Sequence, residues 1–236
     1  MGLCLTGRKE DVADLVFLTN DSLNVEWIAN NLLNDVFYYN EIRNMRGCTG
    51  FFDGTRVSVQ GLGIGPVNAA MYAVEITNEL DAKMLIKIDT CRSLQADIGL
   101  GDIILPQTAH TTSRINKHRF NGQTFPAVAD FIWMDHVYTE ALKKDKNVFA
   151  GPVVSIETRH ELEIAKQFAE RGALAIDMEM NQTFTAAQRF HIPCVGILTV
   201  TENLVTGEKM NEEEAQKSFQ DIARFALDAV TKRVEG

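Results

Sequence analysis

Short apolar runs alternate with amphipathic stretches along almost the whole sequence. Seven runs have the length of a buried strand or the alternation of a half-buried one: 15–18, 56–60, 84–88, 102–105, 148–156, 174–176 and 193–200. Helical patterns lie between them, after residue 22, after residue 65, at 131–142, after residue 177 and from residue 211. Strands that alternate with helices predict an α/β fold, namely a three-layer αβα sandwich around a mostly parallel or mixed central sheet.

The composition is typical of a folded globular chain. Of its 236 residues, 45% are hydrophobic and 23% are charged, and no linker rich in Gly, Ser or Pro divides them. We therefore expect a single domain over residues 1–236. No apolar run approaches the eighteen or so residues of a membrane span, so no membrane partner is expected. The net charge of −9 argues against nucleic acid, which binds basic surfaces.

The cysteine pattern indicates a reducing compartment. The four cysteines are scattered and show neither zinc-site spacing nor a disulfide framework: Cys4, Cys48, Cys91 and Cys194. The first ten residues become charged too soon for a signal peptide. We expect a cytoplasmic protein.

Polar and glycine residues follow several of the expected strands, where ligands of α/β sheets bind. The four junctions of this kind are 19–24, 61–68, 87–94 and 199–205. Glycines at 61, 63 and 65 lead into a helix; their amides could cradle an anion, although a tight turn is the commoner use of such glycines. Asp177 and Glu179 follow a buried strand, where they could bind a polyhydroxyl ligand or serve as acids at a helix N-terminus.

Seven segments carry a recognisable order and spacing: 11–18, 43–50, 61–65, 93–102, 125–131, Ile-Asp-Met-Glu at 176–179 and Leu-Thr-Val-Thr-Glu at 198–202. Together they resemble the nucleoside phosphorylase family over nearly the whole chain. The resemblance is to the hexameric bacterial-type purine nucleoside phosphorylases, with the uridine phosphorylases as relatives.

The resemblance implies a reaction in which phosphate cleaves the N-glycosidic bond of a nucleoside, giving ribose 1-phosphate and free base. An anion beneath the sugar stabilises the cation-like transition state, and an acid near the base neutralises the leaving group. Glu179 matches the residue that grips the sugar hydroxyls, over a methionine that matches Met178. Ile64, Thr90 and Thr201 are further implied substrate contacts.

The resemblance also implies an assembly. Arg43 matches an arginine that family members contribute to the phosphate site of a neighbouring subunit. A homo-oligomer is therefore expected, with a dimer as the smallest active unit and a hexamer as the alternative assembly. No cofactor and no metal are implied.

The phosphate site departs from the family pattern. Residues 20–24 read Asn-Asp-Ser-Leu-Asn where the family has Gly-Asp-Pro-x-Arg, so a glycine and an arginine are missing. Residues 87–92 read Lys-Ile-Asp-Thr-Cys-Arg where the family has Arg-x-Gly-Ser/Thr-Cys-Gly. Lys87 keeps the charge without the two-pronged geometry of arginine, and Asp89 puts a carboxylate where phosphate lies. Four candidate phosphate ligands remain, although we expect the last of them to pair with Asp89: Arg43, Lys87, Thr90 and Arg92.

The residues that match the family's nucleobase site also depart from the family pattern. Glu202 stands in place of the catalytic Asp and is one methylene longer. The arginine that assists this acid aligns with Ala215, and the sugar-contacting histidine near the N-terminus aligns with Cys4. The aromatic residue that stacks on the nucleoside falls near Arg159 or His160, and we take Arg159 as the substrate contact.

Three functions remain open on these residues. The first is a nucleoside phosphorylase with a rebuilt anion site, acting on a small-molecule nucleoside with phosphate or another anion. The second is a nucleosidase that uses water, and the third is a catalytically impaired relative that binds a nucleoside. A purine is favoured, because the chain lacks an insertion that uridine phosphorylases carry before the Asp-Met-Glu segment.

Overall fold

The computed structural model describes residues 2–158 and 162–234. The strands are β1 (Leu15–Thr19), β2 (Asn34–Asn40), β3 (Gly47–Phe52), β4 (Thr55–Gly61), β5 (Met84–Ser93), β6 (Ile103–Thr111), β7 (Val148–Ser155), β8 (Ala175–Asp177) and β9 (Cys194–Asn203). The α-helices are α1 (Ser22–Leu32), α2 (Pro66–Asn78), α3 (Ile115–Arg119), α4 (Phe131–Lys143), α5 (Leu162–Ala169), α6 (Met180–Arg189) and α7 (Glu212–Val234). Two short 3-10 helices lie at Lys9–Asp11 and Ile42–Asn44.

The strands form one mixed sheet in the order β2-β3-β4-β1-β5-β8-β7-β6-β9. Strands β4, β1, β5 and β9 run parallel to one another in succession, through the pairs β1–β4, β1–β5 and β5–β9. The β5–β9 pairing also closes strands β5, β8, β7, β6 and β9 into a ring. The parallel strands thus end at a common edge, beside the closed part of the sheet.

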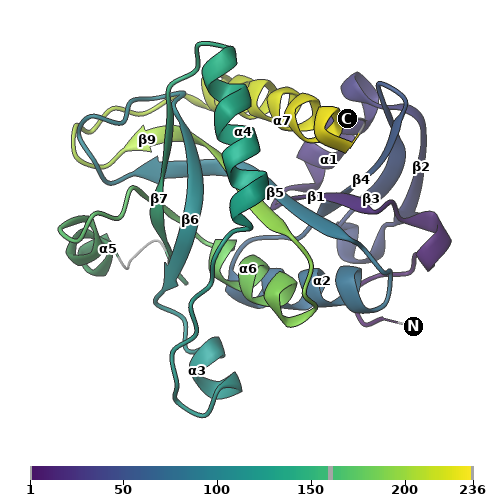
Figure 1. Ribbon diagram of the computed structural model, residues 1–236, viewed down its shortest axis with the longest axis horizontal. Coiled ribbons are helices and arrows are strands. Elements are labelled where there is room, and N and C mark those ends of the chain that lie inside the picture. The colour runs from purple at the N-terminus through teal and green to yellow at the C-terminus, as the bar shows by residue number, and fades with distance from the viewer. Residues whose placement is uncertain (1, 159–161, 235–236) are drawn as a thin grey trace.

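Helices cover both faces of this sheet. Figure 1 shows α1, α4 and α7 on one side and α2 and α6 on the other. One core joins strand residues to α1, α4 and α7, through side chains such as Ile28, Val137 and Phe219. A second core joins the opposite strand faces to α2 and α6, through side chains such as Tyr72 and Phe184. Two cores on opposite faces explain the three layers, because central strands such as β1 and β5 are buried along most of their length.

The α/β sandwich predicted from the sequence is confirmed, and each expected strand and helix is present, although β5 and β6 run well past their expected ends at 88 and 105. Asp21 caps α1 by accepting a hydrogen bond from the Leu23 amide at 2.8 Å. Four elements were not predicted from the sequence, namely β2, β3, α3 and α5, and neither was the closed ring of strands.

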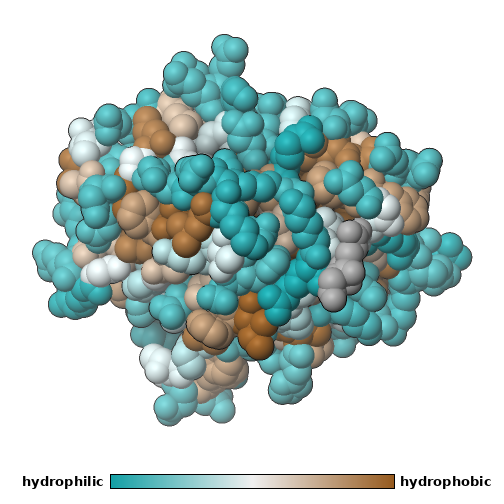
Figure 2. Space-filling model, turned by 45° about the horizontal axis from the view of Figure 1, so that its top comes forward, coloured by the Kyte–Doolittle hydropathy of each residue, from teal (hydrophilic) through white to brown (hydrophobic). Residues whose placement is uncertain are grey.

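The surface view in Figure 2 shows a largely hydrophilic face with separate apolar patches. Among residues 2–158 and 162–234, no helix is long and apolar enough to cross a membrane.

Candidate active site

A cavity of about 360 Å³ lies at the edge where the parallel strands end. Its lining residues come from segments far apart in the sequence: Asn20, Ile64, Thr90, Cys91, Arg92, Ile176, Asp177, Met178, Glu179, Thr201, Glu202, Lys209, Met210, Asn211, Glu212 and Ala215. The volume suits a small molecule. The four strand-end junctions predicted from the sequence therefore meet at one cavity, together with the segment after β8.

A bulge in β9 presents two of the predicted residues to this cavity. In the β5–β9 ladder Cys91 pairs with Val200 and Arg92 pairs with Glu202, so Thr201 is an extra residue. A bulge re-aims the side chains around it. Thr201 and Glu202 both line the cavity as a result, opposite the end of β5.

The turn between β8 and α6 fixes the position of Glu179. One carboxylate oxygen of Asp177 accepts hydrogen bonds from the amides of Glu179 (2.7 Å) and Met180 (2.5 Å). Its other oxygen accepts from the Ser155 hydroxyl at 2.7 Å. The buried Asp177 carboxylate therefore fixes the backbone of this turn, which places Met178 and Glu179 at the cavity wall.

The Glu179 side chain is almost completely buried, at 3% exposure. Its Oε1 accepts a hydrogen bond from the Gly65 amide at 2.7 Å, and its Oε2 lies 3.8 Å from Lys87 Nζ. Gly65 has a φ of 97°, which a residue with a side chain rarely adopts. Of the two uses considered for these glycines, the amide of Gly65 does bind an anion, and that anion is Glu179.

Burial raises the pKa of Glu179 to about 7, because the charged carboxylate loses its contact with water. The nearby carboxylates of Asp89 and Asp177 raise it further, while the Lys87 ammonium and the Gly65 amide oppose the shift. For Lys87, burial disfavours the charge, but Asp89 and Glu179 outweigh it and the pKa of the ammonium is raised. Lys87 is therefore charged at neutral pH.

Asp89 lies at the centre of a cluster of hydrogen-bond donors. Its carboxylate forms an ion pair with Lys87, and both side chains are buried. The Asn20 amide donates to Asp89 Oδ2 at 3.1 Å, and the Thr90 amide donates to Oδ1 at 2.9 Å. The expected pairing of Asp89 with Arg92 is replaced by this contact with Lys87, because both side chains lie on the same face of β5. Arg92 itself lines the cavity.

Asn24, which stands at the position of the family's phosphate-binding arginine, is turned inward. Its side chain is buried and donates to the Thr19 hydroxyl at 3.2 Å. Within the described residues the cavity lining includes Asn20 but not Asn24. Residues 20–24 thus bring no positive charge to the cavity, and the Asn20 amide is already bound to Asp89.

Glu202 has a cationic neighbour that the sequence analysis missed. Lys209 Nζ lies 3.9 Å from Glu202 Oε2, and a β-bridge joins the two residues. Ala215, at the position of the family's assisting arginine, lines the same cavity. The turn after β9 brings Lys209 back beside Glu202, and this turn was not predicted from the sequence.

Arg43 lies away from this cavity. It sits in a 3-10 turn with a left-handed φ of 55°, and its guanidinium donates to the Leu3 carbonyl at 2.9 Å. Among the described residues it does not line the cavity that holds Glu179. The structure therefore separates Arg43 from the other predicted phosphate ligands of its own chain.

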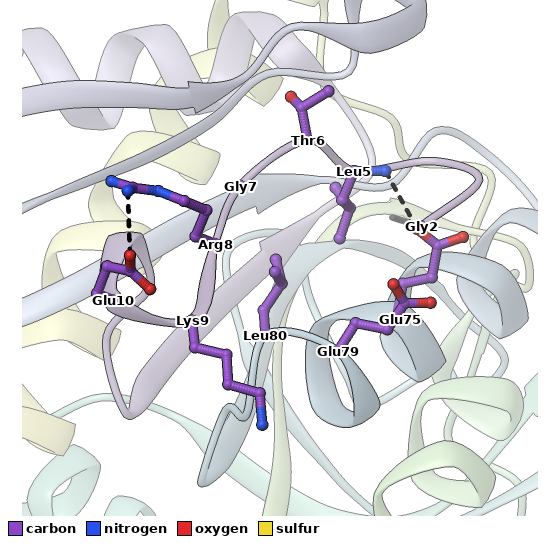
Figure 3. Close-up of a pocket in the computed structure, with 10 residues that line it drawn as sticks. All are labelled: Gly2, Leu5, Thr6, Gly7, Arg8, Lys9, Glu10, Glu75, Glu79 and Leu80. Atoms are coloured by element: carbon purple, nitrogen blue, oxygen red, sulfur yellow. Dashed lines mark hydrogen bonds and ion pairs between the residues drawn. The ribbon is translucent and has the colours of Figure 1, made fainter.

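The N-terminal segment next to Arg43 is fastened to α2 by one carboxylate. Glu75 accepts hydrogen bonds from the amides of Leu3 (2.9 Å), Cys4 (2.9 and 3.0 Å) and Leu5 (3.1 Å). Figure 3 shows the segment crossing above Glu75, with the bond from Leu5. The Cys4 side chain is fully buried, so it does not present a polar group as the family's histidine does.

Two predicted substrate contacts remain. Ile64 lines the cavity with a side chain that is 64% exposed. Arg159, with its neighbour His160, lies outside the described residues. No group of three or more His, Cys, Asp or Glu side chains suited to a metal ion occurs in the described ranges.

Comparison with known proteins identifies the family of this chain. The family model for the phosphorylase superfamily matches residues 14–234. A protein from Caldanaerobacter subterraneus subsp. tengcongensis, named purine nucleoside phosphorylase DeoD-type, is 38% identical over 97% of this chain and 99% of its own length. A protein of the same name from Listeria monocytogenes serotype 4a is 34% identical over 98% of this chain and its own full length. This chain therefore belongs to the phosphorylase superfamily.

Proposed function

We propose that this protein cleaves the N-glycosidic bond of a purine nucleoside with phosphate. In this reaction the bond between the sugar C1′ and the base nitrogen breaks, and a phosphate oxygen forms a new bond to C1′. The base takes up a proton and leaves, and ribose 1-phosphate remains. The observation that carries the proposal is that the carboxylates of Glu179 and Glu202 line one cavity, in a chain whose full-length relatives carry this activity in their names.

The roles of the residues follow from their chemistry. Glu179 accepts hydrogen bonds from the ribose hydroxyls, and Met178 packs beneath the sugar. Ile64, Thr90 and Thr201 complete the nucleoside contacts at the cavity wall, with Arg159 as a further contact. Glu202 acts as the general acid that protonates the departing base, and Lys209 stabilises the carboxylate that forms.

We also propose that the working unit is a homo-oligomer of at least two chains. Arg43 is exposed, lies away from the cavity of its own chain, and bonds to the N-terminal segment. A cation in this position serves phosphate binding only if it reaches the cavity of a neighbouring subunit, where Lys87, Thr90 and Arg92 are the other candidate ligands.

We propose a single domain over residues 1–236 and a reducing, cytoplasmic environment. All four cysteines are buried free thiols, which supports a compartment that does not oxidise them.

A second candidate function is hydrolysis of the same bond by water. The observation that favours it is the Asp89 carboxylate, which already occupies the donors of the proposed phosphate site. The products would then be ribose and free base.

Release of the base tests the proposal. Purified protein is incubated with inosine, adenosine or uridine, with and without inorganic phosphate, and the free base is quantified by chromatography. We expect release from the purine nucleosides, faster with phosphate than without. Preferential cleavage of uridine would overturn the choice of base, and equal rates with and without phosphate would favour the hydrolase.

A further inference from the structure

We infer that the Asp89 carboxylate is a resident anion of the phosphate site, which inorganic phosphate must displace in order to bind. This inference rests on the proposed function. It states how access of phosphate to its binding site is controlled. It concerns a residue of this chain at a position where the resembled family has glycine.

The contacts of Asp89 are those of a bound anion. Its two oxygens accept from two backbone amides, Asn20 N–H at 3.1 Å and Thr90 N–H at 2.9 Å, and Oδ2 also contacts the Lys87 ammonium. The side chain is only 5% exposed. Backbone amides and a cation that converge on one anion form a site of the kind that holds phosphate.

The same donors are needed by an incoming phosphate. Asn20 follows β1, and Lys87 and Thr90 lie within β5; these are the two segments where the sequence predicts phosphate contacts. Each amide hydrogen is already used, and Lys87 faces Asp89 and Glu179 from within the protein. Phosphate can take these donors only when Asp89 leaves them.

Electrostatic repulsion prevents phosphate and the Asp89 carboxylate from occupying these donors together. A phosphate seated on the same donors would lie in contact with the Asp89 carboxylate, and like charges at that separation repel strongly in a buried site. The carboxylate must therefore rotate away, or phosphate binds only at high concentration. Nucleoside contacts with Met178 and Glu179 do not require this movement, so the competition acts on phosphate alone.

Phosphate binding to the intact protein provides the test. Isothermal titration with inorganic phosphate compares the wild type with Asp89→Ala, which removes the resident anion. Asp97→Ala is the matched control, because Asp97 is an exposed acid outside the cavity lining of the described residues. We expect Asp89→Ala to lower the dissociation constant of phosphate about tenfold or more, and Asp97→Ala to leave it unchanged. An equal dissociation constant for the wild type and Asp89→Ala would overturn the inference.

A second variant guards against loss of folding, because Asp89→Ala leaves Lys87 without one of its two carboxylates. Asp89→Asn keeps the shape and an acceptor oxygen but removes the charge. We expect phosphate to raise its melting temperature more than that of the wild type. An equal or smaller rise would contradict the displacement of a charged competitor.

Activity separates this inference from the proposed function. If the inference holds, the KM for phosphate in base release falls in Asp89→Ala while the KM for the nucleoside stays within about twofold. Base release with an unchanged KM for phosphate would refute the inference and leave the proposed function standing. Tighter phosphate binding by Asp89→Ala without base release from any variant would support the inference and refute the proposed function.

Discussion

Lys87 and Asp89 lie two residues apart on β5 and form a buried ion pair, with side chains 1% and 5% exposed. Residues two apart on a strand point to the same face, so the sequence Lys-Ile-Asp places both charges on one face of β5, buried behind the residues that line the cavity. Glu179 approaches the same ammonium from the end of β8, at 3.8 Å. The Lys87 ammonium thus neutralises two carboxylates, Glu179 at the proposed sugar site and Asp89 at the proposed phosphate site.

Replacement of Lys87 by methionine tests how far the fold depends on this cation. The variant leaves the carboxylates of Asp89 and Glu179 buried without their positive partner, and such a loss costs about 3–5 kcal/mol. Chemical denaturation should show the free energy of unfolding lowered by this amount. Lys83→Met is the control, because the ion pair of Lys83 with Asp81 is exposed and its loss should leave stability nearly unchanged. Equal stabilities of the two variants would refute the role given to Lys87.

Nucleoside binding should depend on pH through Glu179. Its pKa is raised to about 7, so the group is protonated in the free protein below that pH. The ionised carboxylate is the stronger acceptor for ribose hydroxyls. Nucleoside affinity is therefore expected to fall as the pH drops below about 7 and to level off above it.

Glu179→Gln is the matched variant, because it keeps the size of the side chain and cannot ionise. Titration calorimetry should show binding weaker by about tenfold or more at pH 8, with the pH dependence removed. Unchanged affinity in this variant would rule out Glu179 as the ribose ligand.

Lys209→Met tests the cation next to the proposed acid. Lys209 lies 3.9 Å from Glu202 and is 63% exposed, so solvent screens the pair. We expect kcat for base release to fall about two- to fivefold, with little change in the KM for nucleoside. High salt should reduce the wild-type rate toward that of the variant. A larger KM at constant kcat would instead make Lys209 a binding residue.

The oligomeric state tests the placement of Arg43. Sedimentation at micromolar concentration should show a dimer or a larger assembly. Arg43→Met should raise the KM for phosphate in that assembly, because the partner's cavity loses a cation. A monomer that retains full activity would show that Arg43 has no part in the site.

The alternation of strands and helices was enough to predict the layers and the edge at which the cavity lies, because that pattern is local. Strand β2 escaped prediction because most of its residues are partly or fully exposed, and no apolar alternation marks it. The pairing of β5 with β9 brings together residues more than a hundred positions apart, which no local pattern encodes.

In the candidate site, too, some features could be predicted from the sequence and others could not. The sequence identified Lys87, Asp89 and Glu202 as the changed positions, since each departs from a known motif. It did not identify their partners. The Asn20 amide reaches Asp89 only through the pairing of β1 with β5. The contact with Lys87 is local on β5, but Arg92 was the expected partner. Asp89 meets Lys87 and the Asn20 amide, not Arg92 as expected, and Glu202 meets Lys209.

The central claim is that the cavity of Glu179 and Glu202 transfers the sugar of a purine nucleoside to phosphate. Phosphorus NMR of wild-type protein with inosine and phosphate tests it most directly, with Glu202→Gln as the matched variant. We predict a sugar-phosphate ester signal that grows in proportion to released base, and a rate at least about a hundredfold lower in Glu202→Gln. Absence of the ester signal and of free base with the wild type, or equal rates for both proteins, would contradict the claim.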